Sequence, residues 1–129
     1  MIVLDTHVWV WWLAKPQRMA KKCARTIERA SRIGVPSICA WEVAMKAHTG
    51  RLKFDRPYDI WIEEALTQDS RIELLPLLPR IAIEAVQLSW DHPDPADRFI
   101  VATARVHGAP LMTSDARMHD SRLVCCVWS

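Results

Sequence analysis

Residues 94–104 have the sequence DPADRFIVATA, and LMTSD follows at residues 111–115. Asp94 is typical of a helix N-cap, Pro95 of the first helical position and Gly108 of a helix end. Between them, apolar residues recur at helical spacing, so one face of this helix is expected to be buried. The chain then changes to a short apolar run, typical of a strand, which ends in an acid.

Four acidic side chains stand where predicted elements meet. Asp5 closes the N-terminal apolar run, Glu42 lies in the first turns of a helix after the apolar segment 35–38, Asp97 lies in the first turn of the helix above, and Asp115 ends the strand that follows. If the strands are parallel, these positions lie at one edge of the sheet, where such sheets bind ligands. Acids at helix starts also often serve only as caps, an effect of roughly 1 kcal/mol.

Length and composition predict a single soluble domain, residues 1–129. Half of the residues are hydrophobic and a quarter are charged, and the net charge of +2 does not by itself indicate a nucleic-acid binder. The four cysteines have no metal-type pairing and are expected to be reduced core thiols, the last two in a buried terminal strand: Cys23, Cys39, Cys125 and Cys126.

We expect a cytoplasmic protein with no membrane segment. The N-terminus lacks a basic leader and is interrupted by Asp5, which does not fit a signal peptide. The apolar run at residues 8–14 is much shorter than the roughly 20 residues that a membrane helix needs.

Strands and helices are predicted to alternate along the chain. Strands are predicted at residues 2–4, 35–38, 71–75, 111–113 and 123–127, and helices at 6–13, 17–31, 40–49, 59–68, 79–88 and 95–107, with a helical turn at 116–118. This alternation indicates an α/β domain with a mostly parallel sheet of about five strands and helices on both faces.

Two of these helices leave their roles open. Helix 6–13 is apolar nearly all round and contains three tryptophans, which suits either the core or an interface. Helix 17–31 carries a basic stripe, which is either a solvated face or a surface for RNA phosphates or an acidic partner. The stripe consists of Arg18, Lys22, Arg25, Arg29 and Arg32.

Clustered carboxylates repel one another, and a divalent cation removes that conflict. Oxygen-only ligands favour Mg²⁺ or Mn²⁺ over zinc. A carboxylate-held Mg²⁺ suits hydrolysis of a nucleic-acid backbone, and no Ser-His-Asp set, Cys-His set or glycine-rich phosphate loop is apparent. The histidines lack metal-binding spacing and are expected to be surface or packing residues: His7, His48, His92, His107 and His119.

Four segments in order resemble the motifs of PIN-domain proteins, and more narrowly of the VapC-type toxins of bacterial toxin–antitoxin pairs. They are IVLDTH at residues 2–7, WEVAMK at 41–46 with GRL at 50–52, HPDPADRFIVATA at 92–104, and LMTSD at 111–115. The resemblance implies a three-layer α/β/α domain that cleaves RNA with Mg²⁺ or Mn²⁺. It also implies a homodimer and inhibition by a cognate VapB-type antitoxin.

Carried onto this chain, the resemblance makes Asp5 and Asp97 the principal metal ligands. Glu42 and Asp115 would then bind a second ion or orient water, and Thr6 and Thr113 would offer hydroxyls to the site. Cys39 departs from the family, because many relatives have a serine there that caps the helix of Glu42; the hold on Glu42 is expected to be looser unless Ser37 takes over. Arg98, beside Asp97, is open to two interpretations, neutralising a phosphate or pairing with an acid.

Two other functions are considered. Phosphoryl transfer to Asp5 would need a second acid beside it and a lysine after a later strand, yet Thr6 and His7 follow Asp5 and no lysine follows Lys53. A non-catalytic RNA-binding or interaction protein with the same fold would be expected to have lost some of the four acids, and all four are present.

Overall fold

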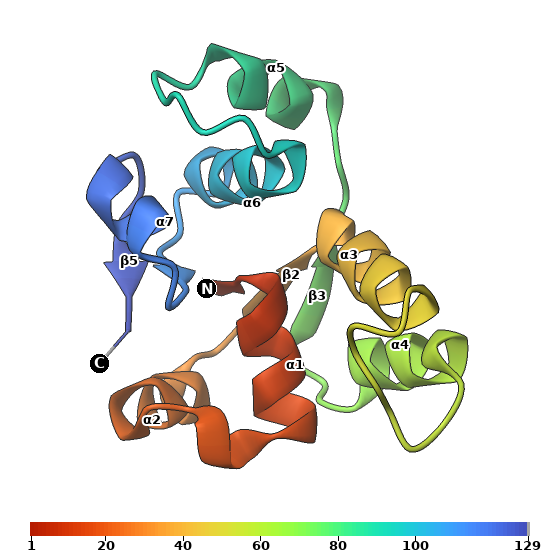
Figure 1. The fold of residues 1–129 in the computed structure, drawn as a ribbon. Coiled ribbons are helices and arrows are strands. Elements are labelled where there is room, and N and C mark those ends of the chain that lie inside the picture. Colours follow the sequence, from red (N-terminus) through yellow and green to blue (C-terminus); the bar gives the residue numbers. More distant parts are fainter. Residues whose placement is uncertain (129) are drawn as a thin grey trace.

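A five-stranded parallel sheet with helices on both faces forms the molecule (Figure 1), which the computed structural model describes over residues 1–128. The strands are β1 (Ile2–Leu4), β2 (Ile33–Pro36), β3 (Ile72–Leu75), β4 (Leu111–Met112) and β5 (Cys126–Val127), in the order β3-β2-β1-β4-β5. The helices are α1 (Thr6–Ala14), η1 (Pro16–Arg18, a 3₁₀ helix), α2 (Lys21–Arg29), α3 (Ser37–His48), α4 (Tyr58–Thr67), α5 (Pro79–Gln87), α6 (Pro95–Val106) and α7 (Ala116–Ser121). The predicted α/β class, with a mostly parallel sheet of about five strands, is confirmed.

The central strand is β1, whose three apolar residues are all buried. Val3 pairs with Gly34 of β2 on one side and with Leu111 of β4 on the other. The strand order therefore reverses at β1, because β2 and β3 extend the sheet to one side and β4 and β5 to the other. A crevice forms beside the carboxyl end of such a strand, and Asp5 is the first residue after it.

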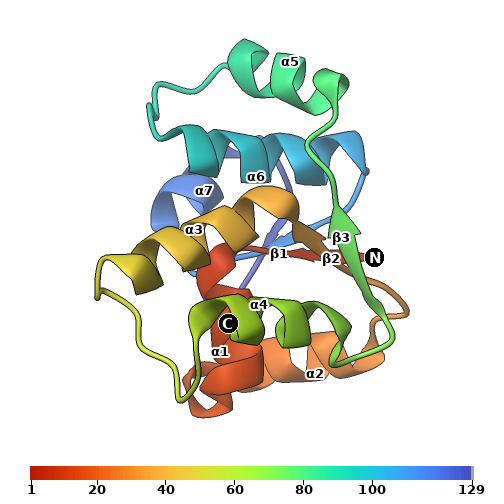
Figure 2. The same cartoon turned by 90° about the vertical axis from the view of Figure 1, so that its right-hand side faces the viewer.

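The helices enclose the sheet in layers. Seen nearly edge-on, the sheet has α5 and α6 above it and α1, α2 and α4 below it (Figure 2). Helix α5 lies outside α6 and packs on it through a small apolar cluster of its own, formed by Ile81, Ala85 and Ala102. None of the helices in residues 1–128 is long and apolar enough to cross a membrane.

The helix predicted over residues 17–31 is wrong in its extent, because two helices occupy this segment. The first ends at Arg18 and α2 begins at Lys21; the two residues between them have extended backbone, with ψ of 131° and 140°. The basic stripe is therefore divided. Arg18 lies over the ring of Trp11, and Arg32 forms an ion pair with Glu73.

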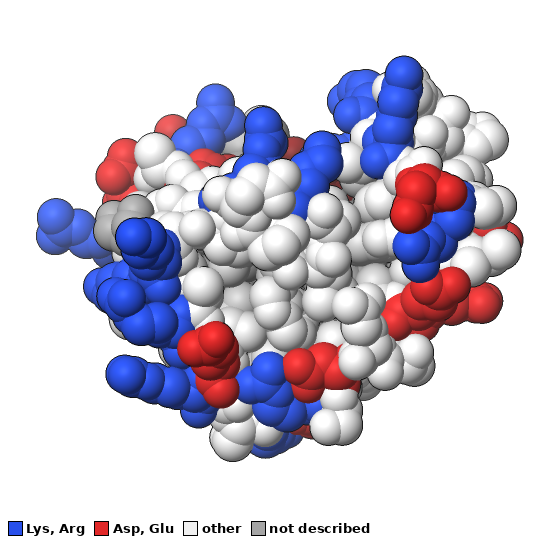
Figure 3. All heavy atoms as spheres, turned by 90° about the horizontal axis from the view of Figure 1, so that it is seen from below, with Lys and Arg blue, Asp and Glu red and all other residues white. Residues whose placement is uncertain are grey.

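The remaining cations of this region are exposed on α2: Lys21, Lys22, Arg25 and Arg29. Figure 3, which views the molecule from below, shows Lys and Arg side chains gathered along one side of this face. Both interpretations of the basic surface, solvated or occupied by a partner, therefore stay predictions.

The second strand was predicted two residues too late, because it ends at Pro36 and α3 begins directly at Ser37. Cys39 therefore lies inside the helix and is not its cap. Its side chain is fully buried, with Sγ 3.9 Å from the carbonyl oxygen of Leu4. Ser37 makes no capping hydrogen bond either, so the expected exchange of caps is wrong.

The last strand is also shorter than predicted, and its cysteines are not in the core. Cys125 is exposed and Cys126 is half-buried, whereas Cys23 and Cys39 are buried as expected. All four are free thiols. The sequence overestimated the strand because its apolar run continues through Leu123 and Val124, which pack against the core without joining the sheet.

Several apolar side chains of α4 and α5 are exposed. In α4, Ile60 faces solvent and Trp61 is buried in its place. In α5, Ile83 and Val86 are 56% and 79% exposed, because the helix contacts α6 through Ile81 and Ala85. An apolar residue at helical spacing thus need not face the core when the helix is an outer layer.

Helix α1 uses its tryptophans within the chain. Trp9 is fully buried and its ring lies 5.4 Å from that of Trp61. Trp11 is half-buried and packs against His7 and Trp128. Trp9 therefore belongs to the core, the first of the two roles considered for this helix.

Candidate active site

The four predicted acids line one pocket of about 320 Å³ at the carboxyl edge of the sheet. Asp5 follows β1 directly, Glu42 lies in α3, Asp97 lies in the first turn of α6, and Asp115 is the third residue after β4. The parallel topology brings these distant positions together, as predicted. The full lining is Asp5, Thr6, His7, Glu42, Met45, Lys46, Arg51, Asp94, Asp97 and Asp115.

Two buried threonines connect the deepest carboxylates. The hydroxyl of Thr6 donates to Oε1 of Glu42 at 2.5 Å, and the hydroxyl of Thr113 donates to Oδ2 of Asp5 at 2.7 Å. The other oxygen of Asp5 accepts from the backbone N–H of Thr6 at 2.8 Å. The hydroxyl of Thr113 also accepts from the backbone N–H of Asp115 at 3.0 Å. Thr6 thus holds the carboxylate of Glu42 in place, and Thr113 holds that of Asp5.

Three helices begin at the pocket, and each has an aspartate as its N-cap. Asp5 caps α1, Asp94 caps α6 and Asp115 caps α7. Because helix N-termini are positive, the ends of α1 and α6 partly offset the charge of the acids, and the short α7 adds its N–H groups. Since Asp94 accepts the backbone bonds of α6, Asp97 in the same turn is free to point into the pocket.

The pKa values show that this offset is incomplete. Burial, followed by the charges of Asp97 and Asp115, raises the pKa of Asp5 to about 6, despite the hydrogen bonds from Thr113 and Thr6. Burial also raises the pKa of Glu42 and of Asp97. Lys46 lowers the pKa of Glu42 in part, and the Arg51 side chain lines the same pocket. The pocket therefore holds more negative charge than its protein surroundings balance.

This donor set fits a hard divalent cation. The acids offer several oxygen atoms to a small, mostly polar cavity, and carboxylate oxygens are the preferred ligands of Mg²⁺ and Mn²⁺. A bound cation would favour the ionised form of each carboxylate and so oppose the effect of burial on its pKa. Asp5, Glu42, Asp97 and Asp115 are therefore candidate ligands for such an ion. Within residues 1–128, the group whose ligand atoms all lie within 4.8 Å of one another is His92, Asp94 and Asp97.

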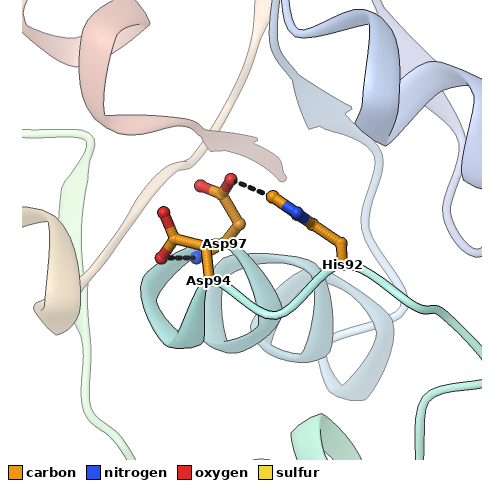
Figure 4. Close-up of side chains that lie close together, drawn as sticks. All are labelled: His92, Asp94 and Asp97. Atoms are coloured by element: carbon orange, nitrogen blue, oxygen red, sulfur yellow. Dashed lines mark hydrogen bonds and ion pairs between the residues drawn. The ribbon is translucent and has the colours of Figure 1, made fainter.

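Two histidines that were expected to be surface or packing residues contact the acids. The ring of His92 lies beside Asp97, with Nε2 2.6 Å from Oδ2, and Asp94 lies next to both (Figure 4). The ring of His7 lies near Asp5, with Nδ1 3.3 Å from Oδ2. Only the position of His92 five residues before Asp97, across a short loop, hinted at such a contact.

His7 is neutral in this setting, because burial lowers its pKa to about 4. Its Nε2 accepts from the backbone N–H of Ser114 at 3.2 Å, so the proton lies on Nδ1, which faces Asp5. The ring thus links the end of β4 to the first acid.

Arg98 has neither of its predicted roles. Its five N–H groups donate to backbone carbonyls of α5 and of the loop that follows it, which leaves no donor for a phosphate or an acid. The acceptors are the carbonyls of Ala85, Val86, Leu88, Trp90 and His92.

Cavity size alone would have pointed elsewhere. A cavity of about 740 Å³ lies between the end of α1, the loop at residues 53–56 and α4. Its acids Asp55 and Glu64 are both paired with Arg56. The concentration of unbalanced carboxylates, and not the volume, therefore identifies the candidate site.

The pKa of Asp5 predicts an inverse dependence of stability on pH in metal-free buffer. Between pH 3.8 and about 6 the folded chain keeps a proton that the unfolded chain has lost, so the free energy of unfolding falls as pH rises through this window. Asp5→Asn removes this pH-dependent decrease in the free energy of unfolding, which amounts to at most about 3 kcal/mol. We expect the variant to melt several degrees above wild type at pH 8 in EDTA, and the difference to shrink at pH 4.5.

The control is Asp59→Asn, an exposed acid on α4 outside the pocket, which should show no such dependence on pH. Thermal unfolding followed by circular dichroism measures both variants. An equal difference in melting temperature at the two pH values would show that Asp5 carries no burial penalty.

The sequence pattern of the PIN domain matches residues 2–122. The chain is 35% identical over 122 residues to ribonuclease VapC22 of Mycobacterium tuberculosis, covering 94% of this chain and 92% of that protein. Among solved structures it is similar to VapBC2 from Rickettsia felis bound to a DNA fragment from its promoter, with a TM-score of 0.74, 16% identity and full coverage of both chains. It is also similar to VapBC-1 from nontypeable Haemophilus influenzae, with a TM-score of 0.71, 16% identity and coverage of 98% and 97%.

At these low identities the two solved structures support the fold. The match over nearly the whole chain and the 35% identity carry the assignment further, and they agree with the motif resemblance. The chain belongs to the PIN-domain family.

Proposed function

We propose that this protein is a Mg²⁺- or Mn²⁺-dependent endoribonuclease that acts as the toxin of a toxin–antitoxin pair. The observation that carries the proposal is the convergence of Asp5, Glu42, Asp97 and Asp115 in one pocket whose charge the protein leaves unbalanced. The 35% identity to a VapC ribonuclease supports RNA as the substrate. A cytoplasmic location, where RNA is abundant, is part of the proposal.

In this proposal Asp5 and Asp97 are the principal metal ligands, and Glu42 and Asp115 bind a second ion or orient water. When bound, the cation supplies a Lewis acid that lowers the pKa of water and offsets charge on the phosphodiester oxygens. The chain itself fixes the ligands, since Thr113 holds Asp5 and Thr6 holds Glu42. Lys46 and Arg51 at the pocket place positive charge near an incoming phosphate.

Loss of a principal ligand should abolish cleavage. We expect Asp97→Asn and Asp5→Asn to lower the rate of RNA cleavage by at least about 100-fold, because each removes a charged oxygen ligand. EDTA should inactivate wild type, and added Mn²⁺ should restore it. A gel assay with total RNA measures these rates, with Asp59→Asn as the active control.

Cleavage that survives both ligand substitutions and chelation would exclude the metal site. If wild type with Mn²⁺ bound RNA without cutting it, the chain would instead be the non-catalytic RNA-binding protein considered above.

The toxin role predicts a protein partner. Similar solved structures include VapBC complexes, which supports a VapB-type antitoxin. We expect expression of the chain alone to stop bacterial growth, Asp97→Asn to be harmless, and the product of an adjacent gene to copurify and restore growth. Normal growth on expression of an active nuclease would contradict the toxin role while leaving the nuclease intact.

We further propose that the chain forms a homodimer through an apolar patch at the start and outer face of α5. The patch consists of Leu77, Leu78, Ile83 and Val86, each more than 40% exposed. Ile83 and Val86 are three residues apart, so they share one helix face. Exposed large apolar side chains gathered on one element are typical of protein interfaces.

Charge on this patch should separate the subunits. We expect wild type to sediment as a dimer and Ile83→Lys/Val86→Lys as a monomer with an unchanged fold, since neither side chain is in the core. Ile60→Lys, at an exposed isoleucine of α4, is the matched control and should remain dimeric. A monomeric wild type, or a dimeric double variant, would exclude this interface.

A further inference from the structure

His92 joins the acidic pocket to the helix that follows β4. It is only 8% exposed and lies in the loop between α5 and α6. Nε2 is 2.6 Å from Oδ2 of Asp97, and Nδ1 is 2.9 Å from a terminal guanidinium nitrogen of Arg117 in α7. The ring also packs edge-on against Trp90, with the ring centroids 4.7 Å apart. The imidazole is therefore held on three sides.

The two partners of the ring determine its tautomer. A guanidinium has only donors, so Nδ1 of His92 must accept from Arg117 and cannot carry a proton. The proton of the neutral ring is then on Nε2, which faces a carboxylate oxygen that can only accept. Arg117 thus makes His92 a donor to Asp97.

The backbone of His92 is fixed as well. Its carbonyl accepts from Arg98 at 3.1 Å, and the same guanidinium binds the carbonyls of Trp90 and Leu88. Arg98 follows Asp97 in α6, so the loop bearing the histidine is tied to the helix bearing the acid. Arg98 thereby fixes the backbone of His92 relative to the helix that carries Asp97, which sets the distance between the His92 and Asp97 side chains.

We propose that His92 is a positioning residue for Asp97, with Arg117 fixing the tautomer that lets it donate. The inference rests on the proposed metal site and deepens it. Within residues 1–128, Oδ2 of Asp97 is occupied by His92 and Oδ1 has no hydrogen-bond donor, so the contact leaves Oδ1 for a cation. Without the histidine the carboxylate rotates freely, and ordering it costs part of the binding free energy of the metal.

The same geometry argues against His92 as a metal ligand, although its ring lies with Asp94 and Asp97. A ligating imidazole usually donates its other ring N–H to an acceptor. Here the other nitrogen faces a guanidinium, which cannot accept. Binding a metal through Nε2 would therefore require Arg117 to move or the neutral ring to lose its single N–H proton.

The test measures Mn²⁺ binding directly by electron paramagnetic resonance and, in parallel, the rate of RNA cleavage. We expect His92→Phe, which keeps ring volume but removes the donor, to weaken Mn²⁺ binding by about 10- to 100-fold, with cleavage partly restored by excess Mn²⁺. His92→Gln should stay within about threefold of wild type, because the glutamine amide can donate to Asp97 and accept from Arg117. Arg117→Ala should weaken binding in the same direction.

His107→Ala, at an exposed histidine just past the other end of α6, is the matched control and should bind Mn²⁺ like wild type. Asp97→Asn tests the underlying site: Mn²⁺ affinity unchanged by this substitution would refute the proposed metal centre itself. If Asp97→Asn abolishes binding but His92→Phe does not weaken it, the positioning role alone is refuted. Equal losses in His92→Phe and His92→Gln would refute the donor role and point to a nitrogen ligand.

Discussion

The main constraint on this structure is the negative charge of several acids gathered at the carboxyl edge of its parallel sheet. Asp5 and Glu42 are almost fully buried, so water cannot solvate them as it solvates surface acids. Threonine hydroxyls and helix N-termini partly compensate this negative charge. The N-terminus of a full-length helix is equivalent to about half a positive charge. Despite this compensation, burial raises the pKa of Asp5, Glu42 and Asp97. The candidate site thus costs the folded state free energy that a cation can return.

Short connections make this concentration of charge possible. Helix α1 begins two residues after β1 ends, and α3 begins directly after β2. The segments that carry Asp5 and Glu42 are therefore held close to buried strands. Leu4 is fully buried immediately before Asp5, and Cys39 packs against its carbonyl from α3. The cysteine therefore contributes by close packing between the two segments, although it makes no cap. A repelling pair such as Asp5 and Glu42 stays together because the strands beneath it are paired.

The sequence predicted features that depend on local pattern. The run at residues 2–4, the N-cap at Asp94 and the helical spacing behind it each reflect the backbone of a few consecutive residues, and all are present in the structure. The convergence of the four acids followed from the predicted parallel topology, but other features that depend on distant contacts were missed. Arg117, which contacts the other nitrogen of His92, comes from α7, and the exposure of Ile83 and Val86 depends on α5 lying outside α6. Spacing along the chain does not show either the contact of Arg117 with His92 or the exposure of α5, because both follow from packing between elements.

Neighbouring residues at the start of α6 point in different directions and make different contacts. Successive residues of an α-helix point about 100° apart, so Asp97 and Arg98 cannot both face the pocket. Asp94 accepts the free N–H groups of the turn, Asp97 faces the acids, and Arg98 turns toward the loop after α5. Arg98, although next to Asp97 in sequence, therefore fixes the backbone that carries His92 and does not face the pocket. A phosphate contact was considered for Arg98 because it is next to Asp97. Arg98 instead anchors the loop after α5 beside the helix that carries Asp97.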